Sequence, residues 1–202
     1  MLYAFLKVVV RTWLLIYHRV KVEGLKHVPH QGPFILVGNH VSYLDPFYIG
    51  AVIPHHVHFM AKKEAFEHPL TRWFLNRMHA FPVKRGEADL KAIRQALSVL
   101  QEGKVLGIFP EGGRRDYQEL EEIKQGAAYL ALKMDCPVIP VLILGADRAL
   151  PRGKIFLRPA KIQIKVGNPI SLPSGERARQ RQEKLSAEIL DALRKMKASS
   201  AS

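Results

Sequence analysis

One stretch decides both the fold and the site expected of this chain: Phe34-Ile35-Leu36-Val37-Gly38-Asn39-His40-Val41-Ser42-Tyr43-Leu44-Asp45-Pro46. Its first four residues form a continuous apolar run with β-branched members, a pattern typical of a strand buried on both faces. Its last two indicate the start of a helix, since Asp can cap free backbone N–H groups and Pro has the φ angle of the first helical position. His40 is therefore predicted in the loop that leaves a strand, with Asp45 at the mouth of the next helix.

The spacing of His40 and Asp45 predicts a catalytic pair. The loop between them can fold the carboxylate back onto one imidazole nitrogen, which fixes the tautomer and stabilises the imidazolium. The other nitrogen is then free to take a proton from a hydroxyl. By itself this spacing would not outweigh a plainer interpretation, in which Asp45 is a helix cap and His40 a polar loop residue.

The rest of the chain predicts a single α/β domain. Short apolar strands alternate with helical segments, which favours a central, mostly buried mixed sheet flanked by helices. The chain of 202 residues has one domain's length and shows no linker or internal repeat. We expect an interfacial helix over residues 1–19, the main domain over 20–197 and a disordered tail over 198–202.

The N-terminal segment is predicted to be an amphipathic helix. Lys7, Arg11 and His18 recur at helical spacing and leave the remaining faces apolar. A bilayer-spanning helix needs about 20 apolar residues, and this run is shorter and carries two interior cations. We therefore expect it to lie in the membrane interface, although an ordinary core helix is the alternative.

Two later loops have the composition of anion sites. Phe81-Pro82-Val83-Lys84-Arg85-Gly86 is a short strand that ends in two cations and a glycine. Pro110-Glu111-Gly112-Gly113-Arg114-Arg115 follows another buried strand, so that its glycines let backbone N–H groups approach an anion and its arginines can fork onto phosphate oxygens. Lys63, which follows the apolar end of the strand predicted within residues 55–64, could bring an ammonium group toward the His40 loop or could be a solvated surface residue.

Charge and cysteine content indicate which kinds of partner and which cellular compartment to expect. The 31 Lys and Arg exceed the 18 Asp and Glu, giving a formal net charge of +13 that implies an anionic partner such as a membrane surface, a phosphorylated substrate or nucleic acid. The one cysteine, Cys136, can form no internal disulfide, which favours a reducing compartment. We predict no metal site at His55, His56 and His58, because His55 points away from the other two on a strand and no further ligand lies nearby.

As an ordered set, four blocks resemble the signature blocks of the glycerolipid acyltransferases, and most closely the bacterial members that acylate lysophosphatidic acid. The blocks are Asn39-His40-x4-Asp45, Phe81-Pro82-Val83-Lys84-Arg85, Phe109-Pro110-Glu111-Gly112-Gly113-Arg114 and Val138-Ile139-Pro140-Val141. The resemblance covers about residues 20 to 170. It implies transfer of a fatty acyl chain from acyl-CoA or acyl carrier protein to the sn-2 hydroxyl of lysophosphatidic acid, giving phosphatidic acid, with no metal and no cofactor.

The same resemblance assigns roles to residues. His40 and Asp45 are expected to be catalytic, with His40 as the base and Asp45 orienting its ring. The residues expected to bind substrate are Asn39, Lys63, Arg85, Glu111, Gly112 and Arg114. The implied location is the cytoplasmic face of the cell membrane, as a peripheral or monotopic protein. Position 113 departs from the family pattern, since Gly stands where Thr is usual.

Three alternatives stay open. The same chemistry could act on glycerol-3-phosphate or on another lysolipid, because these relatives share the four blocks. A non-enzymatic, basic membrane-surface protein would keep the N-terminal helix and the charge but would have no use for His40 and Asp45. Nucleic-acid binding rests on charge alone and we expect none, because there is no recognition module or interleaved aromatic and basic stripe.

Overall fold

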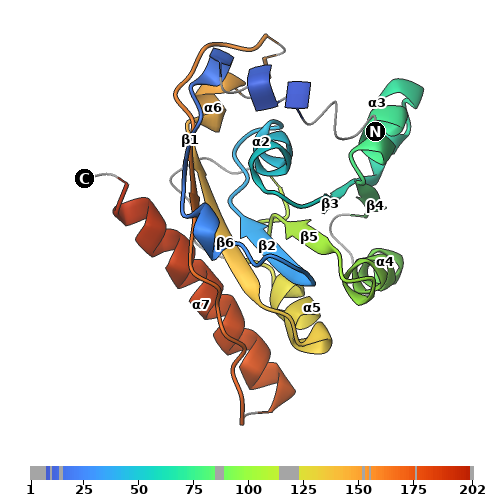
Figure 1. Cartoon of the computed structure of the whole chain (residues 1–202). Coiled ribbons are helices and arrows are strands. Elements are labelled where there is room, and N and C mark those ends of the chain that lie inside the picture. The colour runs from blue at the N-terminus through green and yellow to red at the C-terminus, as the bar shows by residue number, and fades with distance from the viewer. Residues whose placement is uncertain are drawn as a thin grey trace.

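The protein is built around a seven-stranded mixed sheet, as the sequence predicts (Figure 1). The computed structural model describes residues 8–9, 11–13, 16–84, 89–113, 123–151, 153–154, 156–175 and 177–200. The spatial order of the strands is β1-β7-β6-β2-β5-β3-β4. Their bounds are β1 Lys21–Glu23, β2 Phe34–Gly38, β3 Val57–Lys62, β4 Phe81–Val83, β5 Val105–Ile108, β6 Val138–Leu144 and β7 Gln163–Val166.

Five neighbouring strands of the sheet run in the same direction. β6, β2, β5, β3 and β4 pair in parallel, whereas β7 pairs antiparallel to β6 and β1 pairs parallel to β7. The loops that leave the five parallel strands therefore meet at one edge of the sheet, which we call the carboxyl edge. In α/β sheets with this arrangement, ligand sites form at that edge.

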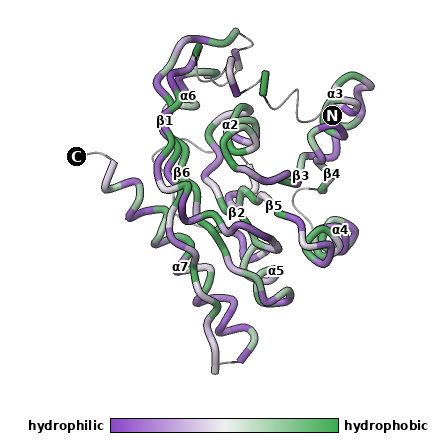
Figure 2. Tube along the Cα trace, in the orientation of Figure 1, coloured by the Kyte–Doolittle hydropathy of each residue, from purple (hydrophilic) through white to green (hydrophobic). Residues whose placement is uncertain are grey.

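Helices cover both faces of the sheet. They are α2 Asp45–Val52, α3 Pro69–Arg77, α4 Leu90–Gln101, α5 Gly126–Met134, α6 Ala146–Ala149 and α7 Ala178–Ala198, with short 3-10 turns η1 Leu25–His27 and η2 Lys63–Phe66. Side chains alternate between the two faces of β2, so the hydrophobic core has two parts. Phe34 and Leu36 pack with α2 on one face, whereas Ile35 and Val37 pack with α4, α5 and α7 on the other. Figure 2 shows the central strands as mostly apolar and α7 as mixed along its length.

Two helices begin at or beside an aspartate, and the two carboxylates have different partners. Helix α4 begins at Leu90, because the Asp89 carboxylate accepts hydrogen bonds from the N–H groups of Lys91 and Ala92 and so caps the first turn. The helix start predicted at Asp45 and Pro46 is confirmed, since α2 begins at Asp45, and this helix has no side-chain cap of its own. The carboxylate of Asp45 is directed to the preceding loop instead, as described below.

The N-terminal segment is helical over residues 8–9, 11–13 and 16–18. It joins the domain through His18, which is fully buried and whose Nδ1 lies 3.0 Å from the Tyr48 hydroxyl on α2. The described part of the chain contains no helix with the length and apolar character required to cross a bilayer.

Candidate active site

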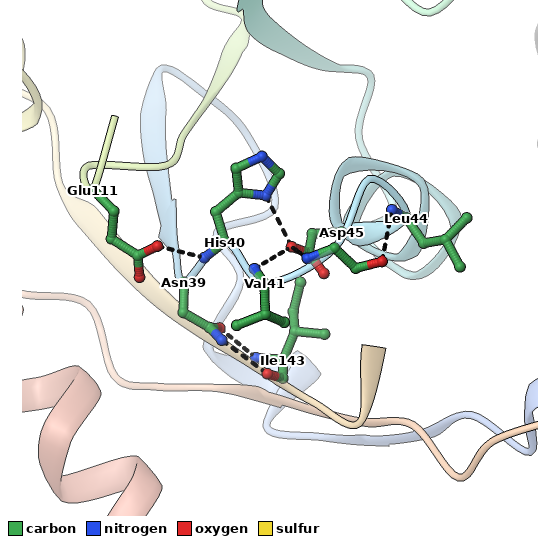
Figure 3. A network of polar contacts seen from close by, with 8 residues as sticks. Asn39, His40, Val41, Leu44, Asp45, Glu111 and Ile143 are labelled. Carbon is green, nitrogen blue, oxygen red and sulfur yellow. Dashed lines mark hydrogen bonds and ion pairs between the residues drawn. The ribbon is translucent and has the colours of Figure 1, made fainter. Parts of the chain in front are cut away.

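The His40–Asp45 contact predicted from the sequence is present at the carboxyl edge (Figure 3). His40 Nδ1 lies 2.9 Å from Asp45 Oδ2, and the Asp45 side chain is fully buried. The same oxygen accepts the backbone N–H groups of Val41 and Ser42, each at 2.7 Å. Three donors thus converge on one carboxylate oxygen, so Asp45 fixes both the imidazole and the backbone of the loop that carries it.

The charges of this pair are set by opposing effects. Burial is the largest influence and raises the pKa of the Asp45 carboxyl, whereas the His40 ring and the two backbone N–H groups act in the opposite direction. Because a carboxylate can only accept, Nδ1 of His40 carries the hydrogen of the contact and Nε2 holds the lone pair. Nε2 points away from Asp45, and none of the described residues forms a hydrogen bond with it (Figure 3). His40 is therefore arranged as a general base.

An aromatic stack supports the other side of the imidazole. The Phe109 ring lies 4.4 Å from the His40 ring, centroid to centroid, at an interplanar angle of 22°. Phe59 of β3 stacks in turn on Phe109 at 5.9 Å. Gly107 makes room for this arrangement, since a Cβ there would lie 2.3 Å from Cε1 of Phe59. The stack holds the ring plane and places a π face against the imidazole, where an imidazolium would be stabilised.

Asn39 and Glu111 hold the backbone on either side of His40. The Asn39 amide donates to the Ile143 carbonyl at 2.9 Å and accepts the Ile143 N–H at 2.7 Å, which extends the pairing of β2 with β6 beyond Gly38. The Glu111 carboxylate accepts the backbone N–H of His40 at 3.1 Å. Figure 3 shows the Asn39 amide directed at Ile143 and away from the His40 ring. These contacts place both side chains as supports of the His40 loop.

The turn after β5 brings a further cation to the site. Gly112 adopts a φ of +70°, and a Cβ there would lie 2.7 Å from Cε and 2.9 Å from Nζ of Lys124. The Lys124 side chain thus lies over the turn, and its backbone N–H donates to the Pro110 carbonyl at 2.8 Å. Lys63 is exposed and begins η2 directly after β3, at the same edge of the sheet. Arg85 and Arg114 lie outside the described residues.

The three histidines near β3 contact different neighbours. His55 contacts the His30 carbonyl at 3.1 Å, whereas the rings of His56 and His58 lie 5.7 and 5.2 Å from that of His79. No group of three or more His, Cys, Asp or Glu among the described residues is placed to hold a metal ion.

Three supporting residues were missed by sequence reasoning. Phe109 stood inside a recognised block, but nothing in the sequence shows that β5 lies beside β2, which is what places its ring on His40. Lys124 is nine residues beyond the predicted anion loop that ends at Arg115, and it follows an acidic segment whose composition is typical of solvated surface. Tyr48 looked like an ordinary apolar helix position, and its bond to His18 depends on where the N-terminal segment packs.

A buried carboxylate that holds Nδ1 of a histidine, with Lys63 and Lys124 at the same edge of the sheet, is an arrangement suited to removing a proton from a hydroxyl beside an anionic group. Comparison with known proteins narrows the class. The profile of the Acyltransferase family matches residues 19–144, more than half of the chain. The chain belongs to this family of acyl-transferring enzymes.

Individual relatives agree with this assignment. The chain is 31% identical over 177 residues to a 1-acyl-sn-glycerol-3-phosphate acyltransferase of Bacillus subtilis, with 84% of this chain and 86% of that protein covered. It is 29% identical over 157 residues to the alpha form of the enzyme of that name from Mus musculus, with 76% of this chain and 55% of that protein covered.

A solved structure matches the fold. It is the crystal structure of the 1-acyl-sn-glycerophosphate acyltransferase PlsC from Thermotoga maritima, with a TM-score of 0.74 and 23% identity over 97% of this chain and 82% of that one. At this identity the likeness shows the α/β fold and its sheet.

Proposed function

We propose that this protein transfers a fatty acyl chain from a thioester to the sn-2 hydroxyl of lysophosphatidic acid, giving phosphatidic acid. The observation that carries the proposal is His40, whose Nδ1 is held by Asp45 and whose Nε2 has no hydrogen-bond partner among the described residues, at the edge where Lys63 and Lys124 lie. The activity for which the relatives are named supports the choice of acceptor. Acyl-CoA and acyl carrier protein are both suitable donors, since each presents the same thioester.

The chemistry follows from the geometry of His40. Nε2 removes the proton of the acceptor hydroxyl as the oxygen attacks the thioester carbonyl. The imidazolium that forms is stabilised by Asp45 and faces the ring of Phe109. Collapse of the tetrahedral intermediate breaks the C–S bond, and the departing thiolate takes the proton from the imidazolium. Acyl transfer is then direct, with no acyl-enzyme.

Binding of the acceptor phosphate brings its hydroxyl to His40. We assign this binding to Arg85, Arg114 and Lys63, with Lys124 adding positive charge to the turn that contains Glu111 and Gly112. An acceptor held by its phosphate beside a fixed base gains the rate advantage of proximity. Asn39 and Glu111 contribute by positioning, because their polar groups hold the backbone around His40.

The protein is proposed to work at an anionic membrane surface, on the cytoplasmic face of the cell membrane. The support is the net charge of +13 together with the N-terminal helix, where Trp13 and Ile16 are exposed. An amphipathic helix with cations and an aromatic ring suits the headgroup boundary. The lysophosphatidic acid and its product would then stay in the bilayer throughout.

A panel of acceptors tests the proposed reaction. Detergent-purified protein is incubated with palmitoyl-CoA or palmitoyl carrier protein and with lysophosphatidic acid, glycerol-3-phosphate or a monoacylglycerol, and products are identified by mass spectrometry. We expect phosphatidic acid from the first acceptor. Product from one of the other acceptors alone would overturn the assignment of the substrate. The lipid is measured directly, because Cys136 would add background to a thiol assay.

The phosphate contact has its own test. Arg85→Ala should raise KM for lysophosphatidic acid and leave acylation of a phosphate-free acceptor, where measurable, nearly unchanged. Arg94→Ala, which removes an exposed arginine from α4, is the matched control and should alter neither. Equal loss on both acceptors would contradict a phosphate-binding role for Arg85.

A further inference from the structure

Helix α3 (Pro69–Arg77) is an amphipathic helix that buries none of its residues. Leu70 is 68% exposed and Trp73 is 51% exposed. By contrast, α2 and α4 to α7 each bury at least two residues. Phe74 is partly buried, so the exposed apolar face of α3 consists of Leu70 and Trp73, which are left largely in water.

This face adjoins the candidate active site. β3 ends at Lys62 on the carboxyl edge, and η2 then leads directly into α3. Phe74 of α3 stacks on Phe47 of α2 at 5.5 Å, two positions after Asp45. Tyr43, in the loop between His40 and Asp45, is 61% exposed. Figure 1 shows α2 and α3 at the same end of the molecule.

The charges around α3 are suited to an anionic lipid surface. Residues 62 to 77 contain four Lys or Arg and two Glu. The guanidinium of Arg77 lies 5.3 Å from the centre of the Trp73 ring, so a cation and an amphipathic aromatic side chain share one position. Tryptophan beside a long cationic side chain is the combination found at the boundary between headgroups and acyl chains.

We propose that α3 is a second membrane contact, which docks Leu70 and Trp73 into the headgroup boundary of an anionic bilayer. Together with the N-terminal helix it would turn the carboxyl edge toward the lipid. This inference deepens the proposed function, and rests on it only for the expectation that the site must face its lipid acceptor. A bilayer is favoured over a protein partner because the exposed apolar residues are few and a cation, Arg77, lies beside Trp73, where it can meet a lipid phosphate.

The two tryptophans of the chain allow a direct test. Trp13→Phe leaves Trp73 as the sole reporter, and Trp73→Phe leaves Trp13. Each full-length protein is mixed with vesicles of phosphatidylcholine and phosphatidylglycerol, with or without bromine atoms on the upper part of the acyl chains. We expect brominated lipid to quench Trp73 in the first variant and Trp13 in the second.

Vesicle affinity gives a second readout. Leu70→Ser combined with Trp73→Ser should weaken partition into anionic vesicles by about tenfold, since two apolar side chains leave the interface. Leu25→Ser is the matched control: Leu25 is 38% exposed on η1, which follows β1 and lies at the opposite edge of the sheet. This control should keep the native affinity.

The outcomes separate the two proposals. Quenching of Trp13 without quenching of Trp73 would overturn the docking of α3. A Trp73 signal that changes with protein concentration in the absence of vesicles would also overturn it, because the apolar face would then bind a second copy of the protein. Quenching of Trp73 in a folded protein that forms no phosphatidic acid would support the docking of α3 and overturn the proposed function.

Discussion

At the scale of single residues, the position of His40 is set from four directions. Asp45 fixes Nδ1, Phe109 covers one ring face, Glu111 holds the backbone N–H, and Asn39 ties the preceding residue to β6. Each contact restricts a different degree of freedom of the imidazole, so Nε2 is presented at a fixed point. This preorganisation is what a general base needs to act without rearrangement.

Removal of the Asp45 charge should impair turnover far more than binding. In Asp45→Asn we expect kcat to fall by about a thousandfold or more, because the ring loses the partner that sets its tautomer and stabilises the imidazolium. KM for the acceptor should change little, since Asp45 is buried and touches no substrate. Steady-state kinetics on protein shown by circular dichroism to be folded would check this, and a kcat within a few fold of native would contradict it.

The stack of Phe109 on His40 predicts a loss of turnover when the ring is removed. Phe109→Leu removes the π face that lies against the imidazole. We expect kcat to fall by about tenfold, which corresponds to ~1.4 kcal/mol. Phe109→Tyr keeps the face and should retain the native kcat. Steady-state kinetics on folded protein would check this, and a Phe109→Leu protein with the native kcat would contradict a role for the stack in turnover.

At the scale of elements, the N-terminal helix and α2 are joined by one buried polar contact. His18 is fully buried, and burial lowers its pKa against a smaller raising effect of the Arg158 backbone. Burial, reinforced by the charge of Asp45, strongly raises the pKa of Tyr48, so its hydroxyl stays protonated and donates to Nδ1 of His18. The helix that carries Asp45 is thereby tied to the N-terminal segment.

Breaking this contact should lower stability. Tyr48→Phe leaves Nδ1 of a buried histidine without its donor, so we expect a loss of about 1–3 kcal/mol in the free energy of unfolding, measured by urea denaturation. Tyr129→Phe, on the exposed side of α5, is the matched control and should be nearly neutral. A Tyr48→Phe protein as stable as the control would show that the His18 contact contributes nothing net.

The sequence predicts those features that depend on neighbouring residues, as the His40–Asp45 contact shows. Four residues separate the pair, and the helix start at Asp45 with its following proline largely determines the loop between them. The ring stack and the Asn39–Ile143 pairing join segments that are far apart in the sequence. They depend on the strand order around β2, which periodicity does not specify. The interface role of residues 1–19 and the substrate-binding role of Arg85 and Arg114 stay predictions.

At the scale of the whole molecule, stability should depend on pH through two neighbouring histidines, His58 and His79. The pKa of His58 is lowered, first by burial and then by the charges of His79 and Lys104. The Val105 and His56 backbones act in the opposite direction, but the net pKa is lowered. Burial and Lys104 lower the pKa of His79, and Glu102 also lies within electrostatic range of His58. Both groups titrate below the ordinary value of 6.5 when folded. Below pH 6.5 the unfolded chain therefore binds more protons at these two histidines than the folded protein does. The free energy of unfolding that they contribute is present above that pH and is lost as the pH falls below it.

The corresponding measurement is thermal unfolding across pH. The Tm of the native protein should fall as pH decreases from neutrality through the region below 6.5. His58→Gln combined with His79→Gln should flatten this dependence, whereas His30→Gln, at an exposed position, should leave it intact. Parallel curves for the double variant and the native protein would contradict the assignment to His58 and His79.

The central claim is that His40 is the base of an acyl transfer to a lysolipid hydroxyl, and one comparison tests it most directly. Phosphatidic acid formation from lysophosphatidic acid is followed by mass spectrometry for the native protein and for His40→Ala, each with the donor that the native protein uses. Unfolding curves establish that both are folded. We expect the variant to lose activity by about a thousandfold or more, a loss of the size expected when a general base is removed. A folded His40→Ala protein with near-native turnover would contradict the mechanism.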